Sequence, residues 1–78
     1  MAKKRKEIPK LDLHGVKHQN VEVLVENFVL SNENRLPVDI ITGMSDTMKK
    51  LVTDILDYHG FEHEEGDFFN KGYIHVIR

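Results

Sequence analysis

Two segments of the chain repeat apolar residues with the spacing of a helix that is buried along one side only. In residues 18–31 and again in residues 48–56, apolar side chains fall at positions i, i+3, i+4, i+7 and i+8. These positions are Val21, Leu24, Val25, Phe28 and Val29, and then Met48, Leu51, Val52, Ile55 and Leu56. Because each helix has a single apolar stripe, both are expected to cover one shared core, which favours two layers over three.

Four short segments beside these helices have the composition or alternation of β-strands. They are residues 10–14, 38–42, 61–64 and 72–77, the last two joined as an antiparallel hairpin. The predicted fold is an α/β, two-layer βαβαββ sandwich: a four-stranded mixed sheet with two helices on one face. The 78 residues contain no cysteine. They suit one small domain, residues 11–78, without disulfides or cysteine-bound zinc.

Alternation along these strands assigns side chains to the two faces of the sheet. The side chains expected to face the helices are Leu11, Leu13, Ile40, Ile74 and Val76. Those expected on the open face are Asp12, His14, Asp39, Tyr73 and His75.

Charge is unevenly distributed along the chain. Residues 1–10 carry five basic and one acidic side chain, a net charge of +4, whereas residues 11–78 carry six basic and twelve acidic side chains, a net charge of −6. The first segment is expected to be a flexible basic tail, because it has little apolar surface to bury. Its cations either attract phosphate groups or only keep the protein soluble. The cations in question are Lys3, Lys4, Arg5 and Lys6. Acidic residues of the hairpin, expected to repel a phosphate backbone, are Glu62, Glu64, Glu65 and Asp67.

No segment has the pattern of a membrane or export signal. The apolar runs fall well short of the roughly 20 residues that a membrane-spanning helix needs. Residues 1–10 lack the apolar stretch of a secretory signal. A cytoplasmic location is therefore expected.

Asp12 and His14 form the first candidate site. Residues two apart on a strand share a face, with Cα atoms roughly 6 to 7 Å apart, so both side chains can address one phosphodiester or one water. An Asp can bind a metal or orient a nucleophilic water, and a His can give or take a proton at neutral pH. The alternative is a pair of solvated polar side chains on an open sheet face.

The tight turn at residues 42–45 is the second candidate site. Its glycine permits close backbone approach, and the following helix presents free N–H groups to an anion. It has neither the lysine of a P-loop nor the three glycines of a dinucleotide-binding turn. The alternative is a helix start capped by Ser45 or Asp46 with no ligand. The turns after His14 and Thr42 are expected to converge, because both follow the carboxyl ends of parallel strands.

The run Leu11-Asp12-Leu13-His14-Gly15, an amphipathic helix, and a strand ending in Ile41-Thr42-Gly43 together resemble the small MutS-related (Smr) domain family over residues 11–78. The resemblance implies a fold similar to the C-terminal domain of translation initiation factor three. It also implies nucleic-acid binding, often with endonuclease cleavage of DNA or RNA. By the same resemblance, Asp12 and His14 would act in cleavage, while Thr42 and Gly43 would shape the binding turn. Ser45 stands where the family usually has a second glycine, so this turn is expected to differ.

The leading prediction is therefore an Smr-type nuclease acting on DNA or RNA phosphodiesters. His14 would be the general acid or base, and Asp12 would orient water or hold a divalent ion such as Mg²⁺ or Mn²⁺. The residues expected near the phosphate are Gly15, Thr42, Gly43 and Ser45. A second hypothesis is a non-catalytic nucleic-acid-binding module on the same fold. A third is a protein-docking domain whose acidic side chains bind a basic ribosomal or repair protein. A monomer is expected, because no second apolar face is apparent.

Overall fold

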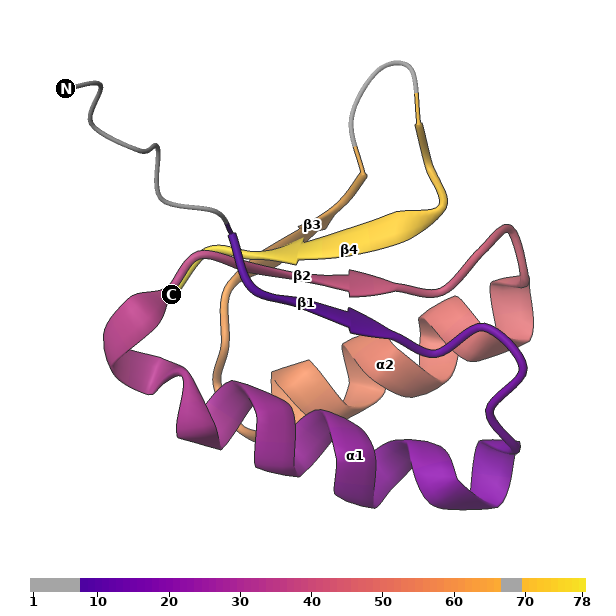
Figure 1. Cartoon of the computed structure of the whole chain (residues 1–78), viewed down its shortest axis with the longest axis horizontal. Helices are drawn as coiled ribbons and strands as arrows, with labels where there is room; N and C mark the ends of the chain where they lie inside the picture. Colours follow the sequence, from indigo (N-terminus) through magenta and orange to yellow (C-terminus); the bar gives the residue numbers. More distant parts are fainter. Residues whose placement is uncertain (1–7, 67–69) are drawn as a thin grey trace, which may run out of the picture.

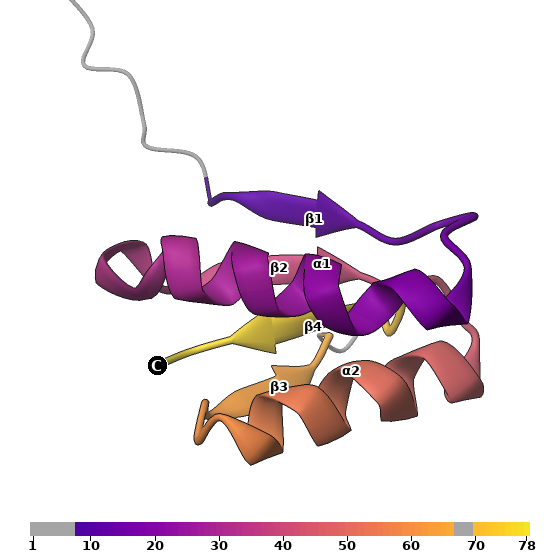
Figure 2. The same ribbon diagram turned by 90° about the horizontal axis from the view of Figure 1, so that it is seen from below.

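The computed structural model describes residues 8–66 and 70–78, which form a four-stranded sheet covered by two helices (Figure 1). In chain order the elements are β1 (Lys10–Asp12), α1 (His18–Ser31), the 3-10 turn η1 (Glu33–Arg35), β2 (Val38–Ile41), α2 (Asp46–Tyr58), β3 (His63–Glu65) and β4 (Tyr73–Val76). Both helices lie on one side of the sheet (Figure 1) and run next to each other across it (Figure 2). The predicted element order, the mixed sheet and the two layers are confirmed.

The strands are arranged in the order β1-β2-β4-β3. β1 pairs with β2 in parallel, with Leu11 opposite Ile40, whereas β4 is antiparallel to both of its neighbours. The connection through α2 places β3 two positions from β2. The predicted hairpin then returns the chain, and β4 fills the position between them. Crossovers of one hand that move in one direction place both helices on the same face, so the topology explains the two layers.

The core lies between the sheet and the two apolar stripes. The buried stripe positions are Val21, Val25 and Val29 on α1, and Met48, Val52 and Leu56 on α2. Leu13, Ile40, Ile74 and Val76 face the helices as predicted and are buried, while Leu11 on the edge strand is half-buried. Leu24 is exposed, because it lies at the margin of its stripe. No helix in the described ranges is long and apolar enough to span a membrane.

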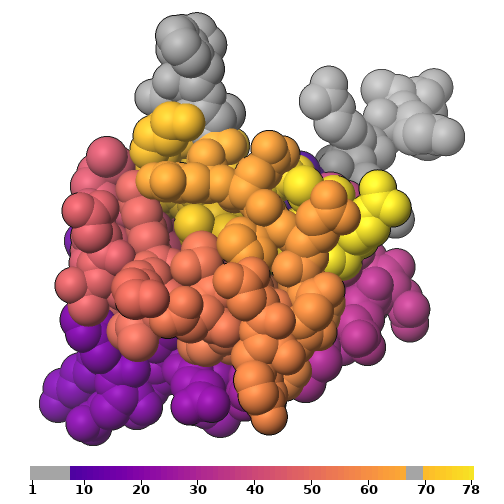
Figure 3. All heavy atoms as spheres, turned by 180° about the vertical axis from the view of Figure 1, so that it is seen from behind, coloured from indigo at the N-terminus to yellow at the C-terminus, as the bar shows by residue number. Residues whose placement is uncertain are grey.

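The ends of α2 are formed by the signals that the sequence indicates. The Ser45 hydroxyl accepts a hydrogen bond from the Met48 amide at 3.1 Å, which caps the first turn. Gly60 has a φ of 79°. The next amide, that of Phe61, returns to the Leu56 carbonyl at 2.9 Å, the pattern of a glycine-terminated helix. Figure 3 shows the surface on which α2 lies against β3 and β4.

Candidate functional site

The first candidate turn begins where β1 ends, at Asp12, two residues before its predicted end. The Leu13 amide still donates to the Ile41 carbonyl at 2.9 Å, but His14 already lies in the turn. The His14 backbone amide donates to Asp12 Oδ1 at 2.9 Å. This local bond shapes the turn that follows the strand. The Asp12 carboxylate therefore contacts the backbone of His14, and His14 lies in the turn and not on the strand where it was predicted.

Both side chains of this turn remain accessible. Asp12 and His14 are exposed, and within residues 8–66 and 70–78 the His14 imidazole has no hydrogen-bond or ionic partner. Asp12 lies opposite Ile41 on the sheet face away from the helices. A carboxylate oxygen and an imidazole at this turn are thus available to an incoming molecule.

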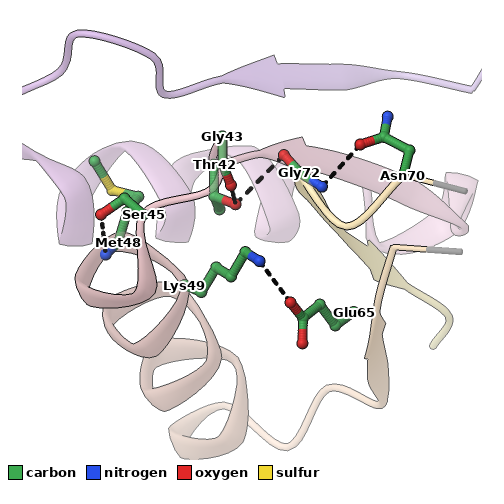
Figure 4. Close-up of polar contacts among 8 residues, drawn as sticks. All are labelled: Thr42, Gly43, Ser45, Met48, Lys49, Glu65, Asn70 and Gly72. Atoms are coloured by element: carbon green, nitrogen blue, oxygen red, sulfur yellow. Dashed lines mark hydrogen bonds and ion pairs between the residues drawn. The ribbon is translucent and has the colours of Figure 1, made fainter.

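The second candidate turn is held by the start of β4. The amides of Thr42 and Gly43 both donate to the Gly72 carbonyl, at 3.0 and 2.9 Å. The Thr42 hydroxyl donates to the Gly43 carbonyl at 2.8 Å and, more weakly, to the Gly72 carbonyl at 3.4 Å (Figure 4). Thr42 is 5% exposed, and Gly43 has a φ of 71°, in the left-handed region that favours glycine. Thr42 and Gly43 therefore build the turn, and their amides do not point to a ligand.

The backbone amides available to an anion directly follow this turn, at the start of α2. Within the part of the chain that the structure describes, the amides of residues 44–47 have no hydrogen-bond acceptor. Unpaired amides are the normal property of a helix N-terminus, which attracts negative charge. Ser45 is exposed beside them, and its oxygen is already occupied as the helix cap.

The two turns lie at the same end of the sheet, as predicted. Because Leu13 is bonded to Ile41, His14 and Thr42 follow adjacent parallel strands at their carboxyl ends. Gly72 joins them from the start of β4, and its amide donates to the Asn70 side chain at 2.8 Å (Figure 4). Asn70 and Gly72 contribute to this end only because β4 enters the sheet beside β2, which no local sequence pattern specifies.

A lysine that the sequence reasoning missed also reaches this end of the sheet. Lys49 Nζ lies 2.6 Å from Glu65 Oε2, and the lysine side chain is only 12% exposed. The hydrogen bond and positive charge of Lys49 lower the pKa of Glu65 below its ordinary 4.5, with a smaller contribution from Lys71. Lys49 lies off the apolar stripe, beside a second lysine, so spacing gave no signal that it would be nearly buried.

The open face of the sheet carries a cross-strand row of ionisable side chains. Lys10, Asp39, His75 and Glu64 are neighbours in the register of the four strands. His75 Nδ1 lies 2.5 Å from Asp39 Oδ1. The predicted outward positions of Asp12, Asp39, Tyr73 and His75 are confirmed by this register.

The basic tail falls largely outside the described residues. Lys3, Lys4, Arg5 and Lys6 lie there, so the structure gives no position for them. The final residues of the tail belong to the sheet: the Pro9 carbonyl accepts from the Asp39 amide at 3.0 Å, and Lys10 begins β1.

The described residues do not form a metal site of their own. Among them no group of three or more His, Asp or Glu side chains is placed to hold an ion. Asp12 offers one carboxylate, of which one oxygen is engaged by the turn. Mg²⁺ keeps several waters and is held by one or two carboxylates together with substrate phosphates, so Asp12 would supply one ligand of such an ion.

Comparison of the chain with protein-family models, with curated proteins and with solved structures finds no match. Function is therefore inferred from the two turns and the side chains around them.

Proposed function

We propose that this protein is an Smr-type nucleic-acid-binding domain, with a fold similar to the C-terminal domain of translation initiation factor three. Nucleic acid would bind at the end of the sheet where the two turns meet. One observation carries the proposal: the exposed turn of Asp12 and His14 lies at the same end of the sheet as the start of α2, where the amides of residues 44–47 have no acceptor among the described residues. Such donors bind the oxygens of a phosphodiester, and an imidazole can exchange a proton with it.

Binding would follow from the charge and the shape of this end. The amides at the start of α2 accept a phosphate group, and the cap formed by Ser45 keeps them in position. Gly15 and Gly43 lack side chains at the two turns, which leaves room for a nucleic-acid backbone. The basic residues 3–6 would add attraction that depends on salt.

Cleavage would use the two exposed side chains of the first turn. The Asp12 oxygen that does not contact the turn would orient a water molecule. His14 would accept a proton from this water as it attacks phosphorus, and would return a proton to the oxygen that leaves when the P–O bond breaks. The outcome would be an endonuclease cut in DNA or RNA.

A second candidate function is binding without cleavage, and one observation favours it. Asp12 Oδ1 accepts the His14 amide, so the carboxylate has a structural task that requires no chemistry. Under this alternative, Asp12 and His14 shape the turn for binding only.

One experiment separates the two functions. Supercoiled DNA and structured RNA are incubated with the wild-type protein, Asp12→Asn and His14→Ala, with and without Mg²⁺ or Mn²⁺. Asp12→Asn keeps an oxygen for the turn but removes the charge, and His18→Ala serves as the control at another exposed histidine. We expect cleavage by the wild type and by His18→Ala, and its loss in the other two variants.

The remaining outcomes are equally informative. Binding by all four proteins without any cleavage would establish the second function. Equal cleavage by all four would remove Asp12 and His14 from the reaction. Absence of both binding and cleavage in the wild type would contradict the whole proposal.

A further inference from the structure

The ion pair between Lys49 and Glu65 lies at the same end of the sheet as the two turns. The Lys49 amide donates to the Ser45 carbonyl at 3.0 Å, so Lys49 lies one helical turn after the cap of α2. Glu65 ends β3 opposite Ile74, on the side of the sheet that faces the helices. Figure 4 shows the Lys49 amine pointing toward Glu65, in the region where Thr42 contacts Gly72.

The hydrogen-bonding capacity of Lys49 is only partly used. An ammonium group has three N–H donors. Within the described residues its one partner is Glu65 Oε2, at 2.6 Å. The lysine side chain is 12% exposed, so water has little access to the remaining donors. A ligand with several acceptor oxygens would satisfy this amine better than one carboxylate oxygen does.

The two partners of this ion pair differ in exposure. The Glu65 side chain is 49% exposed, against 12% for Lys49. A half-exposed carboxylate that rotates away regains water at little cost, whereas a nearly buried ammonium without an anion pays a large desolvation penalty. Exchange of Glu65 for another anion is therefore feasible, and an anionic ligand at Lys49 would replace the charge that Glu65 supplies.

We infer that Lys49 is a further phosphate ligand of the proposed nucleic-acid site, and that Glu65 occupies its position until a backbone phosphate displaces it. This inference rests on the proposed function. It assigns the affinity of the site for nucleic acid in part to Lys49 as a ligand and to Glu65 as its competitor. The phosphate at Lys49 would belong to the same nucleic-acid backbone that reaches the amides at the start of α2. Glu65 would thus lower affinity by direct competition, beyond the general repulsion of an acidic hairpin.

The competing explanation is a purely structural ion pair that ties β3 to α2. It predicts that loss of either partner weakens the protein in the same way. Displacement predicts that the two substitutions change the affinity for nucleic acid in opposite directions. Removal of Glu65 frees the Lys49 amine and raises the affinity, whereas removal of Lys49 deletes the ligand and lowers it. The sign of the change separates the two explanations.

The test measures binding of fluorescent oligouridylate and oligothymidylate by anisotropy at several salt concentrations. The variants are Lys49→Gln and Glu65→Gln, each with a control of equal charge change. Lys50→Gln alters an exposed lysine that pairs with Asp54, and Glu64→Gln alters an exposed carboxylate on the open face. A second arm follows the amide signals of residues 44–47 by NMR during titration with inorganic phosphate.

Displacement predicts that Lys49→Gln weakens binding about tenfold. The same substitution lowers the slope of log affinity against log salt by about 1. Lys50→Gln should change affinity much less. Glu65→Gln should tighten binding about threefold more than Glu64→Gln does. Lys49→Arg should keep most of the affinity, and thermal unfolding checks that each variant is folded. Where Lys49→Gln does not fold, the opposite-sign test rests on Glu65→Gln, which leaves the lysine in place.

Several results would overturn the inference. If Lys49→Gln and Lys50→Gln have the same affinity for the oligonucleotides and the same NMR response to phosphate, Lys49 is not a phosphate ligand. Weaker binding by Glu65→Gln would favour the structural ion pair. If the wild type binds no nucleic acid but its phosphate response still depends on Lys49 and Glu65, the proposed function fails while the anion site stands. If neither ligand has any effect on the wild type, both fail.

Discussion

The two turns at the end of the sheet look alike in sequence but are held in different ways. Asp12 and His14 are exposed, and the hydrogen bond between them joins residues two apart. Thr42 is buried, and its turn is bonded to Gly72, thirty residues later in the chain. The first turn is thus a local structure with exposed side chains. The second connects two strands, and the amides just beyond it have no acceptor among the described residues.

This difference separates two tasks that look the same in a short sequence motif: presenting reactive side chains and fixing the position of a turn. A turn held by local bonds can present reactive side chains, because the fold does not depend on them. A turn held by distant bonds fixes position, so its residues are costly to change even if they touch no ligand. Within the first turn the same division appears between neighbours: Leu13 is fully buried, whereas Asp12 and His14 are exposed.

The largest expected effect on stability is the difference between the buried and the exposed residues of the first turn. Leu13→Ala should destabilise the protein by about 2 to 5 kcal/mol, because it leaves a cavity at a fully buried position. His14→Ala should change the free energy of unfolding by less than about 0.5 kcal/mol. Urea denaturation measures both. A cost for His14→Ala close to that of Leu13→Ala would show that the exposed side chain has a structural task.

The glycines of the two turns should behave alike. Gly15 and Gly43 have φ values of 82° and 71°, and an added Cβ would meet nothing within 4 Å at either. Gly15→Ala and Gly43→Ala should each cost about 1 to 2 kcal/mol, from the left-handed conformation alone. Thermal unfolding of both variants gives the comparison. A much larger cost at Gly43 would mean that its bond to Gly72 is disturbed as well.

The hydroxyl of Thr42 should contribute a smaller amount. Thr42→Val keeps the shape but removes the donor to the Gly43 and Gly72 carbonyls, so we expect a loss of about 1 kcal/mol. Thr53→Val is the control, because the Thr53 hydroxyl bonds only within its own exposed helical turn. Denaturant midpoints for the pair measure the difference. Equal values would indicate that the long-range bond of Thr42 adds nothing.

The smallest expected effect is the pH dependence of the Lys49–Glu65 pair. Lys49 lowers the pKa of Glu65 in the folded protein, so this pair stabilises the fold above the ordinary pKa of 4.5 and ceases to do so as pH falls through the lowered value. Wild-type protein should therefore lose its advantage over Glu65→Gln in acid. Melting temperatures from neutral pH to about pH 2 measure this difference. A constant difference, or the same trend in Glu64→Gln, would exclude the pair as its source.

Much of the fold was predictable because its signals are local. The helix spacing, the cap at Ser45 and the stop at Gly60 each depend on neighbours within one or two turns. The least accurate boundaries were the end of β1 and the start of β3, each two residues from its predicted position.

The site was predictable in part. That His14 and Thr42 meet follows from parallel strands and was expected from their order. The occupation of the Thr42 and Gly43 amides by Gly72 was not, because it depends on where β4 enters the sheet. The burial of Lys49 depends on the same event, since Glu65 reaches it only when β3 forms the edge beside β4.

Sequence alone therefore determined the layers of this protein, the faces of its strands and the end of the sheet at which the two turns meet. These properties follow from periodicity and from backbone conformations that single residues permit. Only the tertiary structure decided which donors stay free and which lysine is nearly buried beside them. Those depend on contacts between residues far apart in the chain, and the order of strands in the sheet brings them together.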